Sequence, residues 1–138
     1  MDQRDARMVF LERVLDATRI LMTLTGRLNR KSRLKASHTV DLLKHQLGYV
    51  LEEFVEVELE SGSTLSYSLA LTWPHDRWHI EAKLQVHRGH EAELLRLIFD
   101  RDVDPDDVEA ALVRVAEDIR ESAESADLES LASAPAID

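Results

Sequence analysis

The alternation of apolar and polar residues between Val55 and Val86 constrains the fold of this chain more than any other feature. A period of two is typical of β-strands that bury one face. The alternation occurs in successive runs, which together predict a three-stranded antiparallel meander over about residues 54–87. The residues expected to face the core are Val55, Val57, Leu59, Leu65, Tyr67, Leu69, Leu71, Trp73, Trp78, Ile80, Ala82, Leu84 and Val86.

The connections between these strands agree with one register, which matters because a slip of one residue would expose every apolar side chain. The first hairpin needs a loop with an odd number of residues, since the residues on both sides of it face inward. Ser61-Gly62-Ser63 supplies such a loop, with Gly62 available for a left-handed conformation. The second hairpin needs an even loop. Residues 74–77 supply it and place Trp73 beside Trp78 on the buried face.

A long helix is predicted before the meander, over about residues 5–28. Its apolar residues recur with helical spacing, and they cover about half of the helix circumference, which is more than one sheet face usually covers. Two interpretations remain open: a central helix surrounded by other elements, or a helix that contacts a second copy of the chain. The candidate dimer residues are Phe10, Leu11, Val14, Leu15, Ala17, Leu21, Leu24 and Leu28.

A second helix is predicted between the long helix and the meander. Ser37 or Thr39 can cap its N-terminus, and it is expected to end somewhere in residues 50–54. Its apolar face is formed by Leu43, Leu47, Val50 and Leu51.

Two more helices are predicted after the meander. Residues 90–99 are predicted to be a short helix, with a fourth strand as the alternative. Asp104 and Pro105 then favour the start of a last helix, with Asp as the cap and Pro at the first helical position. The buried stripe of that helix is Val108, Ala111, Leu112, Val115, Ala116 and Ile119. The prediction is a single α+β domain over residues 1–121, with helices packed on the apolar sheet face, and a frayed or disordered acidic tail over residues 122–138.

Charge is distributed unevenly along the chain, whose formal net charge is −10. Residues 1–45 contain ten Lys and Arg against five Asp and Glu, whereas residues 46–138 contain seven against twenty-two. The densest basic segment is a candidate for contacts with nucleic-acid phosphates. It also matches the preference for cations at the C-terminus of a helix. The residues of this segment are Arg27, Arg30, Lys31, Arg33 and Lys35.

Motifs for catalysis, cofactors or metals are absent from the sequence. The chain has no Cys, no Gly-rich phosphate loop and no nucleophile elbow. His75 and His79 are separated by a predicted turn, and His79 and His87 lie about 26 Å apart along a strand, too far to share an ion. We therefore predict no catalytic residue, no metal site and no cofactor. The chain does not begin with a secretory signal or contain an apolar run of membrane-spanning length, so a cytoplasmic location is expected.

The outward face of the meander is predicted to bind a partner. Its central strand carries small residues there, whereas the neighbouring strands carry charged ones, so the face forms a shallow trough that a helix or peptide can approach closely. His79 would make such binding depend on pH near 6–7. The residues of this trough are Glu56, Glu58, Ser66, Ser68, Ala70, Thr72, His79, Glu81 and Lys83.

Taken together, these features favour a non-enzymatic protein-interaction module of the small acidic adaptor, chaperone, immunity or regulatory type, homodimeric through the N-terminal helix. The alternative is a nucleic-acid-binding protein that uses residues 27–35. An enzyme without a recognisable motif is the third hypothesis.

Overall fold

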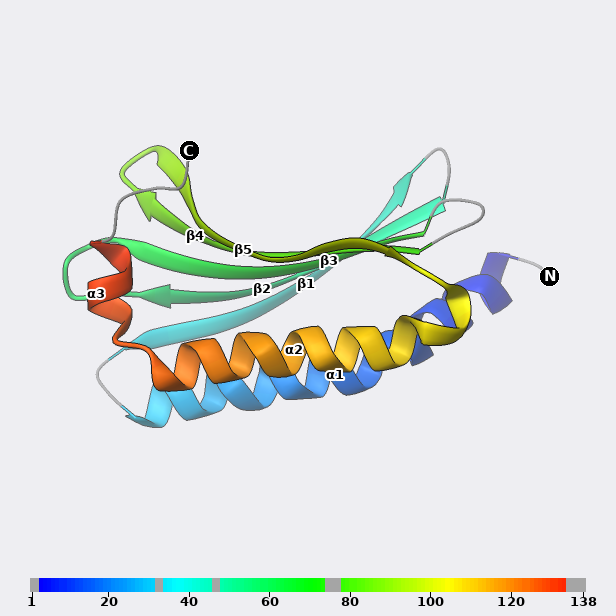
Figure 1. The fold of residues 1–138 in the computed structure, drawn as a ribbon, viewed down its shortest axis with the longest axis horizontal. Coiled ribbons are helices and arrows are strands. Elements are labelled where there is room, and N and C mark those ends of the chain that lie inside the picture. The colour runs from blue at the N-terminus through cyan, green and yellow to red at the C-terminus, as the bar shows by residue number, and fades with distance from the viewer. Residues whose placement is uncertain (1–2, 32–33, 46–47, 74–77, 134–138) are drawn as a thin grey trace.

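The computed structural model describes residues 3–31, 34–45, 48–73 and 78–133, and the side chains of residues 3–11, 13, 31, 45 and 73 lie outside this description. The chain begins with one helix and continues with consecutive strands (Figure 1). These elements are α1 (Gln3–Lys31), β1 (Lys35–His45), β2 (Gly48–Glu58), β3 (Thr64–Trp73), β4 (Trp78–Arg88) and β5 (Glu91–Val103). A 3-10 turn, η1 (Pro105–Asp107), and two helices, α2 (Val108–Ser125) and α3 (Leu128–Ala132), complete the chain.

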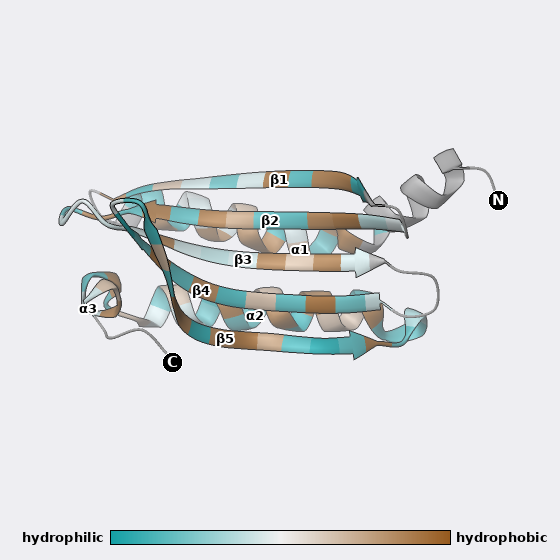
Figure 2. Ribbon diagram, turned by 90° about the horizontal axis from the view of Figure 1, so that it is seen from above, coloured by the Kyte–Doolittle hydropathy of each residue, from teal (hydrophilic) through white to brown (hydrophobic). Residues whose placement is uncertain are grey.

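The strands form one antiparallel sheet in the order β1-β2-β3-β4-β5, so each strand pairs with its neighbour in sequence. The helices α1 and α2 lie side by side against one face of this sheet (Figures 1 and 2). Over the described part of the chain, the opposite face carries no helix (Figure 1). The molecule therefore has two layers, with its core between the sheet and the helix pair.

The predicted three-stranded meander is wrong in extent, because the sheet has five strands. The register predicted for the second hairpin is confirmed, since Tyr67 pairs with Leu84. In the first hairpin the inward parity is correct, but the predicted register is displaced by two residues: Leu65 pairs with Val57 and not with Leu59. The inward residues of these strands that the structure describes are all buried. Strict alternation thus located the centre of the sheet, where one face is covered by helices and the other is not.

The connection of the first hairpin has an odd number of residues as predicted, but it is longer than Ser61-Gly62-Ser63, because residues 59–63 lie between the last paired residues, Glu58 and Thr64. Gly62 has a φ of 91°, which residues with a side chain rarely adopt. The Leu59 amide donates to the Ser63 carbonyl at 2.9 Å and closes the turn. The second loop, residues 74–77, and the side chain of Trp73 lie outside the described residues, whereas Trp78 is buried as predicted.

The predicted second helix is wrong, because residues 35–45 and 48–58 form the paired strands β1 and β2. Leu43 and Val50, two members of the predicted helical face, lie across from each other on these strands, and Leu51, a third member, pairs with Leu42. Leu47, the remaining member of that face, lies outside the described residues. Pairing with β3 supplies β2 with partners on both sides, and this tertiary context overrides a weak local pattern.

The predicted short helix at residues 90–99 is also wrong, and the alternative of a further strand is correct. β5 pairs with β4 from Arg88 opposite Glu91 to Trp78 opposite Val103. Two register shifts, between Ala82 and Lys83 and between Leu84 and Gln85, interrupt the pairing. Such irregularities place extra residues in one strand and break the alternation.

The C-terminal helix follows the prediction at its start. Pro105 opens η1, and the backbone carbonyl of Asp104 accepts from the Asp107 amide at 2.9 Å, although the Asp104 side chain makes no cap hydrogen bond. The predicted stripe of α2 is buried, with Ala111 partly exposed.

The segment from Ser122 to Ser133, expected to be frayed or disordered, is helical in two pieces. Ala123 ends the buried stripe of α2, and Leu128 and Ala132 of α3 are buried. The Asp127 side chain caps α3 by accepting from the Ser130 amide. Among the described residues, no helix is long and apolar enough to cross a membrane.

Candidate functional site

The predicted trough lies on the sheet face that the helices leave free. Ser66 pairs with Glu56 and Gln85, and Ala70 pairs with Glu52 and Glu81, so the small residues of β3 are flanked by charged or polar residues on both sides. The structure therefore brings the predicted floor and walls together on one face.

The floor is accessible only at one end. Ser66 and Ser68 retain 3% and 8% of their exposed surface, whereas Ala70 and Thr72 are partly exposed. The β4–β5 hairpin rises from the sheet on the side away from the helices and leans over the end where β3 begins (Figures 1 and 2). Ser68 is therefore buried, and a substitution there would disturb the packing around it.

At the open end of the trough, four titratable side chains meet on β4 and β5. His79 pairs with Asp102 across the two strands, and Glu81 pairs with Asp100. His79 Nε2 lies 2.6 Å from Asp100 Oδ1, and His79 Nδ1 lies 2.8 Å from Asp102 Oδ1. One ligand atom from each of His79, Glu81 and Asp100 lies within 4.8 Å of the others. We call these four residues the histidine–carboxylate cluster.

The cluster favours the charged form of the imidazole. The hydrogen bond with Asp102 raises the pKa of His79 above its usual value of 6.5, burial opposes this rise, and Asp100 adds to it. A carboxylate at each ring nitrogen stabilises two N–H groups, as only the imidazolium carries. The contribution of His79 to the free energy of unfolding is thus fully present below pH 6.5 and is lost as the pH rises through the folded-state pKa.

Replacing Asp102 by Asn should therefore lower the pKa of His79, because it removes the largest cause of the shift. The measurement is an NMR titration of the His79 ring in the presence of a chelator. Asp118→Asn, an exposed change on α2, is the matched control and should leave the titration unchanged. An unchanged His79 titration in Asp102→Asn would contradict the hydrogen-bonded geometry.

This cluster was not predicted, because residues 90–99 were assigned to a helix and Asp100 and Asp102 were therefore not placed beside β4. Asp100 and Asp102 are two residues apart, which is the spacing of side chains on one face of a strand. That spacing, read as a strand paired with β4, is the signal that would have placed both beside His79.

The predicted dimer residues fall into two groups. Val14, Ala17, Leu21, Leu24 and Leu28 are buried against the sheet and α2. Leu15 is 47% exposed, and the side chains of Phe10 and Leu11 lie outside the described residues. Most of the described arc is therefore core, as the central-helix interpretation predicts.

Large apolar side chains remain exposed along the β1 edge of the molecule. Met22 is 57% exposed on α1, and Val40, Leu42 and Leu43 of β1 are 43%, 37% and 55% exposed. We call these four residues and Leu15 the edge patch. It was not predicted as a unit, because residues 37–54 were assigned to a helix.

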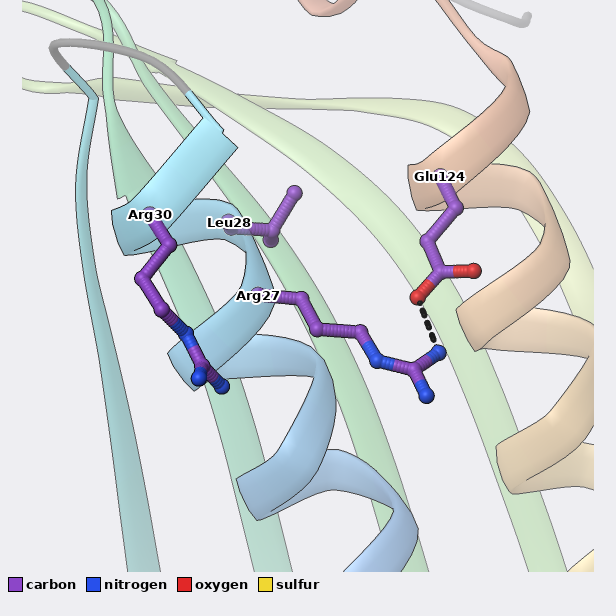
Figure 3. A pocket seen from close by; sticks show the side chains of 4 residues that line it. All are labelled: Arg27, Leu28, Arg30 and Glu124. Atoms are coloured by element: carbon purple, nitrogen blue, oxygen red, sulfur yellow. Dashed lines mark hydrogen bonds and ion pairs between the residues drawn. The ribbon is translucent and has the colours of Figure 1, made fainter.

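The basic segment surrounds the end of α1 and the start of β1. Arg27 reaches across to α2 and forms an ion pair of 2.9 Å with Glu124, and both line a shallow groove with Leu28 and Arg30 (Figure 3). Arg30 donates through Nε to the Gly26 carbonyl at 3.1 Å, and Lys35 is exposed. The side chains of Lys31 and Arg33 lie outside the described residues. A phosphate at this groove would have to compete with Glu124.

A buried hydrogen-bonded pair lies between β1 and β2 on the helix-facing side of the sheet. Glu53 has no exposed surface, and its Oε1 lies 3.0 Å from Nε2 of His38, whose side chain is 11% exposed. The second carboxylate oxygen, Oε2, is buried without a hydrogen-bond partner among the described residues. Glu53 is two residues before Val55, so it points to the same buried face as Val55 and Val57. The sequence pattern would have predicted this position if β2 had been predicted to begin before residue 53.

Comparisons of the chain with protein-family models, with curated proteins and with solved structures found no significant match.

Proposed function

We propose that the protein is a cytoplasmic, non-enzymatic protein-interaction module of the small acidic adaptor, chaperone, immunity or regulatory type, which forms a homodimer through the edge patch. The observation that carries the proposal is the row of exposed apolar side chains beside a free edge strand. Exposed large apolar residues that gather at one edge of a molecule typically mark an interaction site.

The two edges of the sheet differ in how well they are protected. β5 contains two register shifts and many charged residues, which are features that discourage pairing with another strand. β1 instead pairs residue for residue with β2, from Lys35 opposite Glu58 to His45 opposite Gly48. It contains no Pro. Its regular, partly apolar edge is suited to pairing with a further strand.

The members of the edge patch on the helix-facing side, Leu15, Met22, Val40 and Leu42, lie next to each other, whereas Leu43 lies on the opposite face of β1. The Asn29 side chain holds the start of β1 against α1, donating to the Ala36 carbonyl at 3.0 Å and accepting from the Ala36 amide at 2.7 Å. Met22 and Leu15 are seven and fourteen residues before Asn29, so they lie on the same side of α1. A strand rises about 3.3 Å per residue and a helix about 1.5 Å. Val40 is therefore level with the helix turn that ends at Met22, and Leu42 with the turn that contains Leu15.

The regular edge of β1 allows a second copy to pair with it. A two-fold axis perpendicular to the sheet pairs β1 with β1 of the partner in antiparallel fashion and keeps both helix layers on one side. The helix-free sheet faces remain available to another protein.

The dimer is tested by changing Leu15 to Asp, which places a carboxylate in the edge patch. The wild-type chain should have the mass of a dimer at tens of micromolar by light scattering, and Leu15→Asp should have the mass of a monomer with a similar thermal midpoint. Leu97→Asp is the matched control, because Leu97 is 52% exposed on β5, at the other edge. A monomeric wild type, or a Leu15→Asp dimer as tight as the wild type, would refute the proposal.

A further inference from the structure

The geometry points to a binding site for one divalent transition-metal ion in the histidine–carboxylate cluster, with His79 Nε2, Glu81 and Asp100 as ligands. Their ligand atoms all lie within 4.8 Å of one another. Zinc and similar ions bind nitrogen and carboxylate oxygen at about 2.0–2.2 Å, so neighbouring ligand atoms lie about 3 Å apart around them. The half-exposed Glu81 has the rotamer freedom to close this difference.

The arrangement around His79 requires either a proton or a metal ion at Nε2. A neutral imidazole carries one N–H group and one lone pair. If Nδ1 donates to Asp102 at 2.8 Å, the lone pair of Nε2 faces Asp100 Oδ1 at 2.6 Å. Two acceptors at that distance repel each other unless a proton or a metal ion lies between or beside them. A metal ion would bind both Nε2 of His79 and the carboxylate of Asp100, and it would also bind the carboxylate of Glu81.

Asp102 completes the site without binding the metal. Histidine ligands commonly donate their other ring N–H to a carboxylate, which fixes the tautomer and the ring orientation. Asp102 holds His79 in this manner from the directly opposite position on β5. Because all four residues lie on two paired strands, the backbone positions them more rigidly than a loop would.

The surroundings leave room for the ion and for further ligands. Thr72 and Ala70 are the β3 residues that pair with His79 and Glu81, and both are small and partly exposed. The charge also favours a cation, since three carboxylates face one imidazole and one ammonium, Lys83, whose Nζ lies 3.4 Å from Glu81 Oε1. The metal replaces Lys83 as the partner of Glu81.

The donor set selects among metals. One imidazole and two carboxylates with open positions suit zinc, manganese, iron(II) or cobalt, whereas magnesium and calcium prefer oxygen ligands alone. The open positions admit water or a donor group from a bound partner.

The test is a titration of chelator-treated protein with Zn²⁺ by calorimetry, and with Co²⁺ by visible absorption. We expect one ion per chain. Loss of the saturable Zn²⁺ signal in His79→Ala and in Asp100→Asn, and affinity lower by about 10–100-fold in Asp102→Asn, are the expected results. His87→Ala is the matched control, because His87 is an exposed residue of the same strand, and it should bind as the wild type does.

Absence of Zn²⁺ binding at 100 μM protein, or equal binding by wild type and His79→Ala, would overturn the proposal, the latter because the ion would then sit elsewhere. Thermal unfolding in chelator confirms that each variant is folded. Leu15→Asp should bind Zn²⁺ like the wild type, so the metal site and the dimer can fail independently.

Discussion

Replacing His38 by alanine should lower the free energy of unfolding by about 1–3 kcal/mol or more, which is the usual cost of leaving a buried polar group without its hydrogen-bond partner. His38 Nε2 is 3.0 Å from Oε1 of Glu53, a side chain with no exposed surface. The other oxygen of Glu53 has no partner within the described ranges. Without His38, both oxygens of the carboxyl group would be buried without a hydrogen bond, and such a loss is a large part of a domain stability of about 5–15 kcal/mol.

The same reasoning predicts a smaller effect for Glu53. Glu53→Met removes the carboxyl group and keeps much of the volume, so it should cost less than His38→Ala, because the side chain it leaves without a partner, His38, is 11% exposed whereas Glu53 has no exposed surface. The double variant His38→Ala, Glu53→Met should recover most of the loss, because no carboxylate remains to be left unpaired. Urea unfolding followed by circular dichroism measures all three variants.

His87→Ala provides the control for deleting an imidazole, since His87 is exposed. If His38→Ala costs no more than His87→Ala, the pair contributes nothing and the buried carboxyl group is satisfied in another way. Additive effects in the double variant would lead to the same conclusion.

The centre of the sheet was predictable because its two faces differ. On β3 and β4 the inward residues are packed against α1 and α2 and the outward residues are not, so the sequence alternates strictly. β1 lacks this signal, since it lies at the edge and both of its faces are partly exposed: Leu42 on one face and Leu43 on the other. An edge strand of this kind depends on pairing with its neighbour, which a local pattern does not encode.

Whether a candidate site could be predicted depended on whether its strands were predicted correctly. The outward residues of the trough followed from the correct register, and the structure places them on one face. Asp100 and Asp102 approach His79 because the irregular strand β5 pairs with β4. The register shifts interrupt the alternation of apolar and polar residues in β5, so the sequence pattern does not predict a strand there. The edge patch likewise requires that β1 run back along α1.

Two substitutions on α1 should have very different effects on stability, because one lies on the side that packs in the core and the other on the side of the edge patch. Leu24 has no exposed surface, so Leu24→Asp removes a packed side chain, at about 2–5 kcal/mol, and buries a carboxylate without a partner, at several kcal/mol more. Against a total of about 5–15 kcal/mol, this change should leave little folded protein at 25 °C.

Met22→Asp is the matched change two residues away, at a position that is 57% exposed. Surface substitutions of this kind alter the free energy of unfolding by about 0.5 kcal/mol, so Met22→Asp should unfold cooperatively, near the wild-type midpoint. Thermal unfolding by circular dichroism at about 1 μM protein limits any contribution from dimer dissociation, which depends on concentration. A folded Leu24→Asp with the wild-type midpoint would mean that α1 does not pack through Leu24, and the wide apolar arc of this helix would then require a different partner from the sheet and α2.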